Sequence, residues 1–274
     1  MDHFPTNWGN PRSEEVDSYN TYPVASHIGN VPHSVRQIAG YGHTNGHPTS
    51  HTQSPVVTGT SVLGLKYKGG VMMAADNLAS YGSLARFRDI ERLHKVTDFT
   101  VLGASGDMSD FQYVKHLLDS QMIKEYNADD GHTLATHNIY EYLWRVMYNR
   151  RSKMNPLWNT FVLGGVNKGE SFLGAIDLKG TPYQSASIAT GFGSHLAQPI
   201  LRKELEQRGG ENNITEEQAV EILKKSMKVL WYRDARSMNK FQLAKITSEG
   251  VTISESMSVE TEWGFAENIR GYGA

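Results

Sequence analysis

A threonine that follows a glycine at the start of an apolar stretch is the first candidate for chemistry in this chain. The segment reads Gly59-Thr60-Ser61. A threonine hydroxyl becomes a useful nucleophile when a nearby base takes its proton, and a free N-terminal amine can be that base. Such an enzyme must first cut its own chain before the threonine, and a glycine there gives the backbone the freedom that the cut requires. On these residues alone, an ordinary start of a strand is the default interpretation.

The strands that would position this threonine follow from the hydrophobic pattern. Residues 61–67 and 71–76 are apolar and flank Lys68-Gly69-Gly70, which predicts a tight hairpin. Asp76 ends the second strand, so we expect it to lie beside Thr60 across the hairpin.

The later elements alternate in groups. Further strands are predicted at 99–104, 160–164, 172–177, 183–187, 240–247 and 251–254, and helices begin at Ser109, near Thr136, near Ser194 and after a capping box at Thr215. Grouped helices between grouped strands predict an α+β layered fold with antiparallel sheets and helices on their outer faces.

Composition excludes several classes of protein. The chain has 27 basic and 29 acidic residues, a net charge of −2 that argues against a nucleic-acid binder driven by bulk charge. It has no cysteine, which excludes disulfide scaffolds, thiolate zinc sites, iron–sulfur clusters and cysteine nucleophiles. No apolar run is long enough to cross a membrane, and the N-terminus does not read as a secretory signal.

The first 51 residues differ from the rest. They hold five of the nine prolines, six of the eleven histidines and no lysine. This composition predicts a flexible leader without a core of its own. Its histidines could form a metal site, but Gly46 and Pro48 interrupt the helical spacing, so a polar tract is favoured and no metal or cofactor is predicted.

Residues from about Thr52 onward resemble the β-type subunits of the 20S proteasome, and among them the class at the β7 position, called beta type-4 in mammals. The most specific matching stretches are RRSKMNPLWN and the TQSP that begins at Thr52. Others are TGTSVLGLKYKGGVMMAADNLASYGSLARF (58–87), GASGDMSDFQY (103–113), ATGFGSHLAQP (189–199) and WYRDARS (231–237).

This resemblance implies a four-layer αββα sandwich, the N-terminal-nucleophile hydrolase fold. It implies a propeptide at 1–51 and a β-type domain at 52–274, with an N-terminal extension at 52–59 and a C-terminal tail at 263–274 that reaches the opposite ring. The implied partners are other proteasome α and β subunits, in two β rings and two α rings, and assembly chaperones. The implied location is cytoplasm and nucleus, with no nucleic-acid or membrane partner.

The resemblance carries the family's catalytic pattern over only in part. Active β subunits use an N-terminal threonine, an aspartate, a lysine, a serine and an Asp-x-x-Ser pair. The matching positions here are Thr60, Asp76, Arg92, Phe192, Asp234 and Ser237. Arginine stays protonated and cannot pass a proton on as a lysine can, and phenylalanine removes a hydroxyl from the site.

The expected processing also differs from that of an active subunit. The resemblance implies a cut between His51 and Thr52, made by a neighbouring active subunit, which would leave the nitrogen of Thr60 in a peptide bond. We therefore expect a non-catalytic structural subunit. The alternative is a threonine protease cut before Thr60 that uses Asp76 and an unusual Arg92. A free monomeric binding protein is disfavoured.

Two further features remain open. Arg233 and Arg236 flank Asp234 and could pair with acidic groups of a neighbouring subunit, or they could simply end a helix. Trp158, at the end of the RRSKMNPLWN stretch, is expected in the core more than in a contact, although an exposed tryptophan is a favoured contact anchor.

Overall fold

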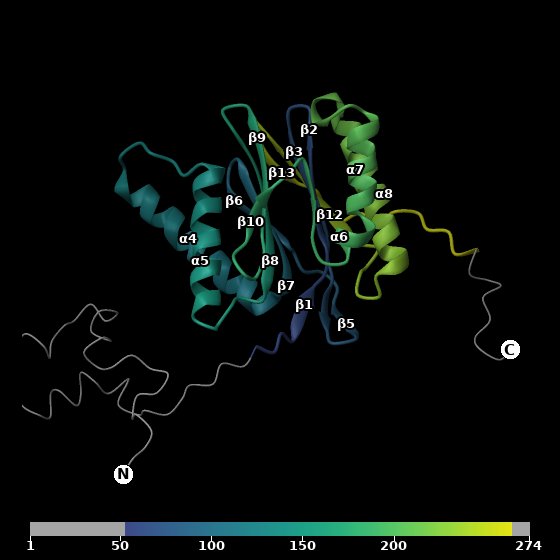
Figure 1. Cartoon of the computed structure of the whole chain (residues 1–274), viewed down its shortest axis with the longest axis horizontal. Coiled ribbons are helices and arrows are strands. Elements are labelled where there is room, and N and C mark those ends of the chain that lie inside the picture. The colour runs from purple at the N-terminus through teal and green to yellow at the C-terminus, as the bar shows by residue number, and fades with distance from the viewer. Residues whose placement is uncertain (1–52, 265–274) are drawn as a thin grey trace, which may run out of the picture. The chain divides into compact units, whose positions relative to one another are not determined.

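The protein is described by a computed structural model that covers residues 53–264. Two antiparallel sheets pack face to face, and a pair of helices covers the outer face of each (Figure 1). The predicted α+β fold and its four-layer αββα arrangement are confirmed. The predicted leader, the cut between His51 and Thr52, and residues 265–274 of the tail lie outside the described residues.

The larger sheet has the strand order β10-β9-β8-β7-β1-β4-β5, with β6 pairing with β7 as well. Its strands are β1 (Val57–Gly59), β4 (Ala79–Tyr81), β5 (Leu84–Phe87), β6 (Leu93–Thr97), β7 (Thr100–Asp107), β8 (Asn159–Asn167), β9 (Glu170–Ile176) and β10 (Pro182–Gln184). Strand β1 lies between β7 and β4 and is antiparallel to both. It is therefore the strand that joins the β4–β5 hairpin to the rest of the sheet.

The smaller sheet has the order β11-β2-β3-β12-β13. Its strands are β2 (Val62–Tyr67), β3 (Gly70–Asp76), β11 (Ser187–Ala189), β12 (Phe241–Thr247) and β13 (Gly250–Ile253). Side chains from both sheets, including Val62, Met73, Val162 and Ile246, form a buried layer between them. The predicted hairpin of β2 and β3 is confirmed, and its register pairs Val62 with Ala75.

The helices cover the outer faces of the two sheets. α4 (Met108–Ala128) and α5 (Thr136–Ser152) pack on the larger sheet, and α7 (Gln198–Gln207) and α8 (Glu216–Arg233) pack on the smaller one. A short α6 (Gly193–Leu196) precedes α7, and a 3-10 turn, η1 (Glu211–Asn213), precedes α8. The capping box at Thr215 is confirmed, because its hydroxyl accepts from the amide of Gln218 while the Gln218 side chain accepts from the amide of Thr215.

Several expected element boundaries are wrong. Asp107, not Ser109, caps α4, because its carboxylate accepts from the amides of Ser109 and Asp110. The strand expected at 183–187 is two strands, β10 and β11, which belong to different sheets. Strands β1, β4, β5 and β6 were not predicted, because segments of three to five residues carry too little periodicity to be recognised.

Within residues 53–264, no helix is long and apolar enough to cross a membrane. The same residues contain no cluster of three or more side chains that could hold a metal ion.

Candidate site around Thr60

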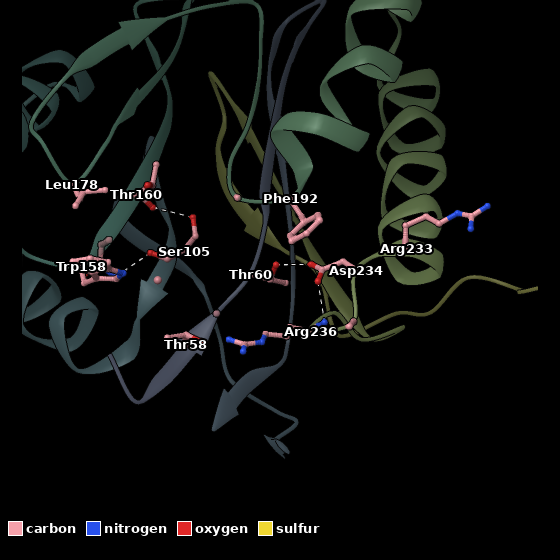
Figure 2. Close-up of a pocket in the computed structure, with 15 residues that line it drawn as sticks. Thr58, Thr60, Ser105, Trp158, Thr160, Leu178, Phe192, Arg233, Asp234 and Arg236 are labelled. Carbon is pink, nitrogen blue, oxygen red and sulfur yellow. Dashed lines mark hydrogen bonds between the residues drawn. The ribbon is translucent and has the colours of Figure 1, made fainter. Parts of the chain in front are cut away.

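A cavity of about 590 Å³ opens at one end of the two sheets, with Thr60 on its wall. Figure 2 shows Trp158, Thr160 and Leu178 on one side of it and Phe192 and Asp234 on the other. The cavity therefore collects residues from β1, β7 and β8 of the larger sheet, Thr60 just before β2, and residues at the two ends of the α6–α8 segment.

The hydroxyl of Thr60 has one close partner. Its Oγ1 donates to Oδ2 of Asp234 over 2.6 Å, although 174 positions separate the two residues in sequence. Asp234 caps the C-terminal end of α8, and its other carboxylate oxygen accepts from the amide of Arg236 at 2.9 Å. The structure thus brings together a hydroxyl and a carboxylate, the pair that a nucleophile and its base would form.

Ser237, the other member of the predicted Asp-x-x-Ser pair, points elsewhere. Its hydroxyl is buried and donates to the carbonyl oxygens of Leu230 and Asp234, at 3.1 and 2.8 Å. The carbonyl of Leu230 also accepts from the amide of Asp234, and the carbonyl of Asp234 accepts from the amide of Ser237, so the hydroxyl is a further donor at the end of α8. Ser237 therefore completes the helix end in this structure and does not contact Thr60.

Arg92 is fully buried, and every N–H of its guanidinium is used. Nε donates to the carbonyl of Asp76 at 2.9 Å, and Nη1 donates to the carbonyls of Thr60 and Ala104 at 2.7 and 3.1 Å. Nη2 donates to the carbonyl of Ser61 at 2.8 Å and to a carboxylate oxygen of Asp76. Because an arginine has five N–H donors, none remains for the Thr60 hydroxyl, and the side chain ties β3 and β7 to the segment before β2.

Asp76 is the buried ionic partner of Arg92. One of its oxygens meets the guanidinium, and the other accepts from the amide of Met238 at 3.0 Å. Burial raises the pKa of Asp76 to about 6, while Arg92 opposes the rise. No hydrogen bond joins Asp76 to the Thr60 hydroxyl among residues 53–264. The two lie at the same end of the β2–β3 hairpin, but Arg92 bridges them.

Gly59 provides the space in which Arg92 lies. A Cβ at this position would meet the Cδ of Arg92 at 2.5 Å and its Nη1 at 3.1 Å. The guanidinium is fixed by its five hydrogen bonds, so it cannot easily move aside. The glycine before Thr60 therefore has a packing role here that is independent of any chain cut.

We predict that Gly59→Ala lowers the free energy of unfolding by about 1–3 kcal/mol, the usual cost of forcing extra atoms into a packed core. Urea unfolding of the full-length chain measures it. In an Arg92→Ala background the same substitution should cost much less, because the clashing side chain is gone. An equal loss in both backgrounds would contradict this account.

The residues before Thr60 form part of the larger sheet. Val57 pairs with Tyr81, and Thr58 lies between Ser80 of β4 and Asp107 of β7. The side chain of Gln53 donates to that of Asn155 at 2.8 Å. The expectation that the first strand begins after this extension is wrong, because the extension itself supplies β1.

Phe192 lies on the cavity wall on the side of Asp234 (Figure 2). Its side chain is 57% exposed and its backbone caps α6. Next to it, the amide of Gly193 donates to the hydroxyl of Ser61 at 2.8 Å. The family resemblance places a serine hydroxyl at this position in active subunits. Here the aromatic ring presents apolar surface instead, and it offers Thr60 no hydrogen-bond donor or acceptor.

Some residues of the cavity wall were missed by sequence reasoning. Ser105 shares a 2.7 Å hydrogen bond with Thr190, and Asn159 donates to the carbonyls of Ser105 and Asp107. These residues stand at strand ends without a recognisable spacing. Trp158 is 40% exposed and lines the cavity, so its expected place in the core is wrong. The neighbouring Leu157 takes the buried position instead.

Arg233 and Arg236 are exposed at the rim of the cavity. Within the part of the chain that the structure describes, neither forms an ion pair. Their pairing with a neighbouring subunit stays a prediction.

Comparison with known proteins gives a consistent result. The family model described as "Proteasome subunit" matches residues 56–246. The chain is 50% identical to "Proteasome subunit beta type-4" of Xenopus laevis over 244 residues, which cover 89% of this chain and 98% of the relative. It is 44% identical to "Proteasome subunit beta type-7" of Saccharomyces cerevisiae over 280 residues, covering 100% and 98%. A "Probable proteasome subunit beta type-7" of Schizosaccharomyces pombe is 49% identical over 228 residues, covering 82% and 87%.

Proposed function

Since the chain belongs to the proteasome subunit family and resembles its β-type members, we propose that it is a non-catalytic β subunit of the 20S core particle. Its work is to complete the β ring and to join half-particles for ubiquitin-dependent protein degradation. The observation that carries the proposal is strand β1. Residues 57–59 are hydrogen-bonded on both sides, and this pairing supports a mature chain in which the segment stays in the sheet and the nitrogen of Thr60 stays in a peptide bond.

The second support is Arg92. A group that lowers the barrier for a threonine nucleophile must accept or share its proton, and arginine remains protonated. Here its five donors hold backbone carbonyls and the Asp76 carboxylate. Removing a single member of a catalytic unit already costs several orders of magnitude in rate.

One contact favours the alternative, an active threonine protease with Thr60 as nucleophile. The 2.6 Å hydrogen bond from Thr60 to Asp234 would orient the hydroxyl in such an enzyme. It would become functional only after a cut between Gly59 and Thr60, which would also separate β1 from the strand that follows it.

The wider organisation is part of the same proposal. Residues 1–51 would be a propeptide removed before Thr52, residues 52–274 the β-type domain, and residues 263–274 a tail that reaches the opposite ring. Assembly chaperones and the α and β subunits of four stacked rings would be the partners, in cytoplasm and nucleus. The matches to β-type relatives over most of their length support this organisation.

The intact mass of this chain from assembled particles tests the proposal. A chain that begins at Thr52 and is not labelled by a threonine-directed electrophile is the expected result, because the Thr60 nitrogen is then an amide. A chain that begins at Thr60, or covalent labelling of Thr60, would favour the protease. An active β subunit of the same particle serves as the positive control for labelling.

A further inference from the structure

The segment that follows β13 runs back along the loop between α8 and β12. Phe241 and Met257 exchange two backbone hydrogen bonds, at 2.9 and 2.8 Å. The side chain of Asn239 accepts from the amide of Val259 at 3.1 Å and donates to its carbonyl at 2.7 Å. Met257 and Val259 also pack against the core under α7 and α8. We call residues 257–263 the C-terminal clasp.

The far end of the clasp is held by the last turn of α8. The hydroxyl of Tyr232 accepts from the amide of Glu262 at 2.6 Å. The ring of Trp263 meets the rings of Tyr232 and Trp231 edge to face, with centroids 5.0 and 6.3 Å away. Edge-to-face aromatic pairs at such separations are favourable beyond the area that they bury. The clasp is therefore anchored on both sides of the 234–240 loop.

The clasp is shorter than the loop that it bridges. From Val259 to Glu262 the chain advances three residues, which span at most about 11 Å. Their partners Asn239 and Tyr232 are seven residues apart in sequence. The clasp therefore limits how far the two ends of the loop can separate, and a loop whose ends are held together loses conformational freedom.

The loop inside the clasp carries two of the contacts that define the Thr60 site. Asp234, at the start of the loop, accepts from the Thr60 hydroxyl (Figure 2). The amide of Met238, near the end of the loop, donates to the buried carboxylate of Asp76 at 3.0 Å. The loop thus connects the clasp to both Thr60 and Asp76.

We propose that the C-terminal clasp is a conformational switch that closes the 234–240 loop and thereby holds the Asp234 carboxylate on the Thr60 hydroxyl. When Trp263 leaves its aromatic partners, the ends of the loop can separate, and Asp234 and the Met238 amide withdraw from the wall of the Thr60 cavity. Coupling between two sites acts equally in both directions, so loss of the Thr60–Asp234 bond must also loosen the clasp. The inference holds whether Thr60 is catalytic or silent.

Hydrogen exchange of the isolated full-length chain, measured at single amides by mass spectrometry, tests the forward direction. Trp263→Ala is expected to speed exchange of the Met238 amide at least about tenfold, while the amide of Ala75 in the β2–β3 hairpin stays unchanged. Tyr126→Ala, at an 85% exposed tyrosine of α4, is the matched control and should change neither amide. An unchanged Met238 amide in Trp263→Ala would overturn the proposal. Equal acceleration at Ala75 would do the same, because the substitution would then act on the whole fold.

Two milder substitutions make the result independent of the removal of a large ring. Tyr232→Phe keeps the ring but removes one acceptor of the clasp, and Asn239→Leu removes both side-chain bonds to the clasp. Each should speed exchange of the Met238 amide at least about threefold. Asn213→Leu also removes an amide that binds two backbone carbonyls, but away from the clasp, and should leave Met238 unchanged. Parent rates in both clasp variants would contradict the proposal.

The reverse direction separates a coupled switch from a local anchor. Thr60→Val removes the hydroxyl at nearly constant volume, and we expect the amides of Val259 and Glu262 to exchange at least about threefold faster. Thr160→Val, at another threonine of the same cavity wall, is the matched control. If the clasp amides kept the parent rate in Thr60→Val, the clasp would be an anchor without influence on Thr60, and the proposal would be wrong.

Discussion

Arg92→Ala is expected to lower the free energy of unfolding by about 3–5 kcal/mol, the range seen when one partner of a buried ion pair is removed. The substitution leaves the Asp76 carboxylate buried without its counter-charge. It also removes donors from the carbonyls of Asp76, Thr60, Ser61 and Ala104. A buried acceptor without a partner is costly by itself. Urea unfolding of the full-length chain measures the change.

Two control variants separate charge from geometry. Arg92→Lys keeps a positive charge but offers three donors from a single point, so it should recover part of the loss and leave some carbonyls unpaired. Arg202→Ala removes an exposed arginine of α7 and should stay within about 0.5 kcal/mol of the parent. If Arg92→Ala lowered the free energy of unfolding no more than Arg202→Ala, the buried hydrogen bonds and ion pair of Arg92 would not contribute to stability.

The loss of stability caused by Arg92→Ala should depend on pH, and the direction of this dependence can be predicted. Burial raises the pKa of Asp76, and Arg92 opposes this rise. Without Arg92 the pKa of Asp76 rises further, so the folded variant keeps a proton that the unfolded chain has lost. A raised folded-state pKa stabilises at low pH, and this stabilisation is lost as the pH rises through that value. The loss caused by Arg92→Ala should therefore be larger near pH 8 than near pH 6.

The site shows what residue types alone can and cannot indicate. The positions of Thr60, Asp76, Arg92 and Asp234 could be found through the family resemblance, and the structure places all four at one end of the sheets. The contacts of Arg92 could not be found in this way. Its partners are mostly backbone carbonyls, which every residue has, so no sequence pattern marks them.

In the fold, too, some elements could be predicted from the sequence and others could not. The long strands β2, β3, β7, β8 and β12 and the helices α4, α5 and α8 have enough residues to display a period, and their locations agree with the prediction. Strand β1 has only three residues and follows Pro55, so it carries no alternation. Its existence depends on the unpaired edges of β4 and β7, which lie 20 and more residues further along the chain.

The part of the extension that forms β1 should be essential for the β4–β5 hairpin. We expect deletion of residues 53–59 to speed amide hydrogen exchange in β4 and β5 about 100-fold. This factor corresponds to a decrease of roughly 2.8 kcal/mol in the free energy of local opening. With β1 absent, β4 and β7 would be two strand spacings apart, about 9.6 Å, too far to bond each other. Hydrogen exchange followed by mass spectrometry measures this peptide by peptide.

A shorter deletion of residues 53–55 is the matched control, because it removes the Gln53–Asn155 contact but keeps Val57, Thr58 and Gly59 in the ladder. Exchange in the hairpin should then stay close to that of the parent. The base of the hairpin has its own bonds, from the amide of Ile90 to the carbonyl of Asn77 and from Lys240 to Asp89. If the longer deletion left exchange unchanged, these bonds would hold the hairpin without β1. Under the proposed processing, the extension would then serve only to keep the Thr60 nitrogen in an amide.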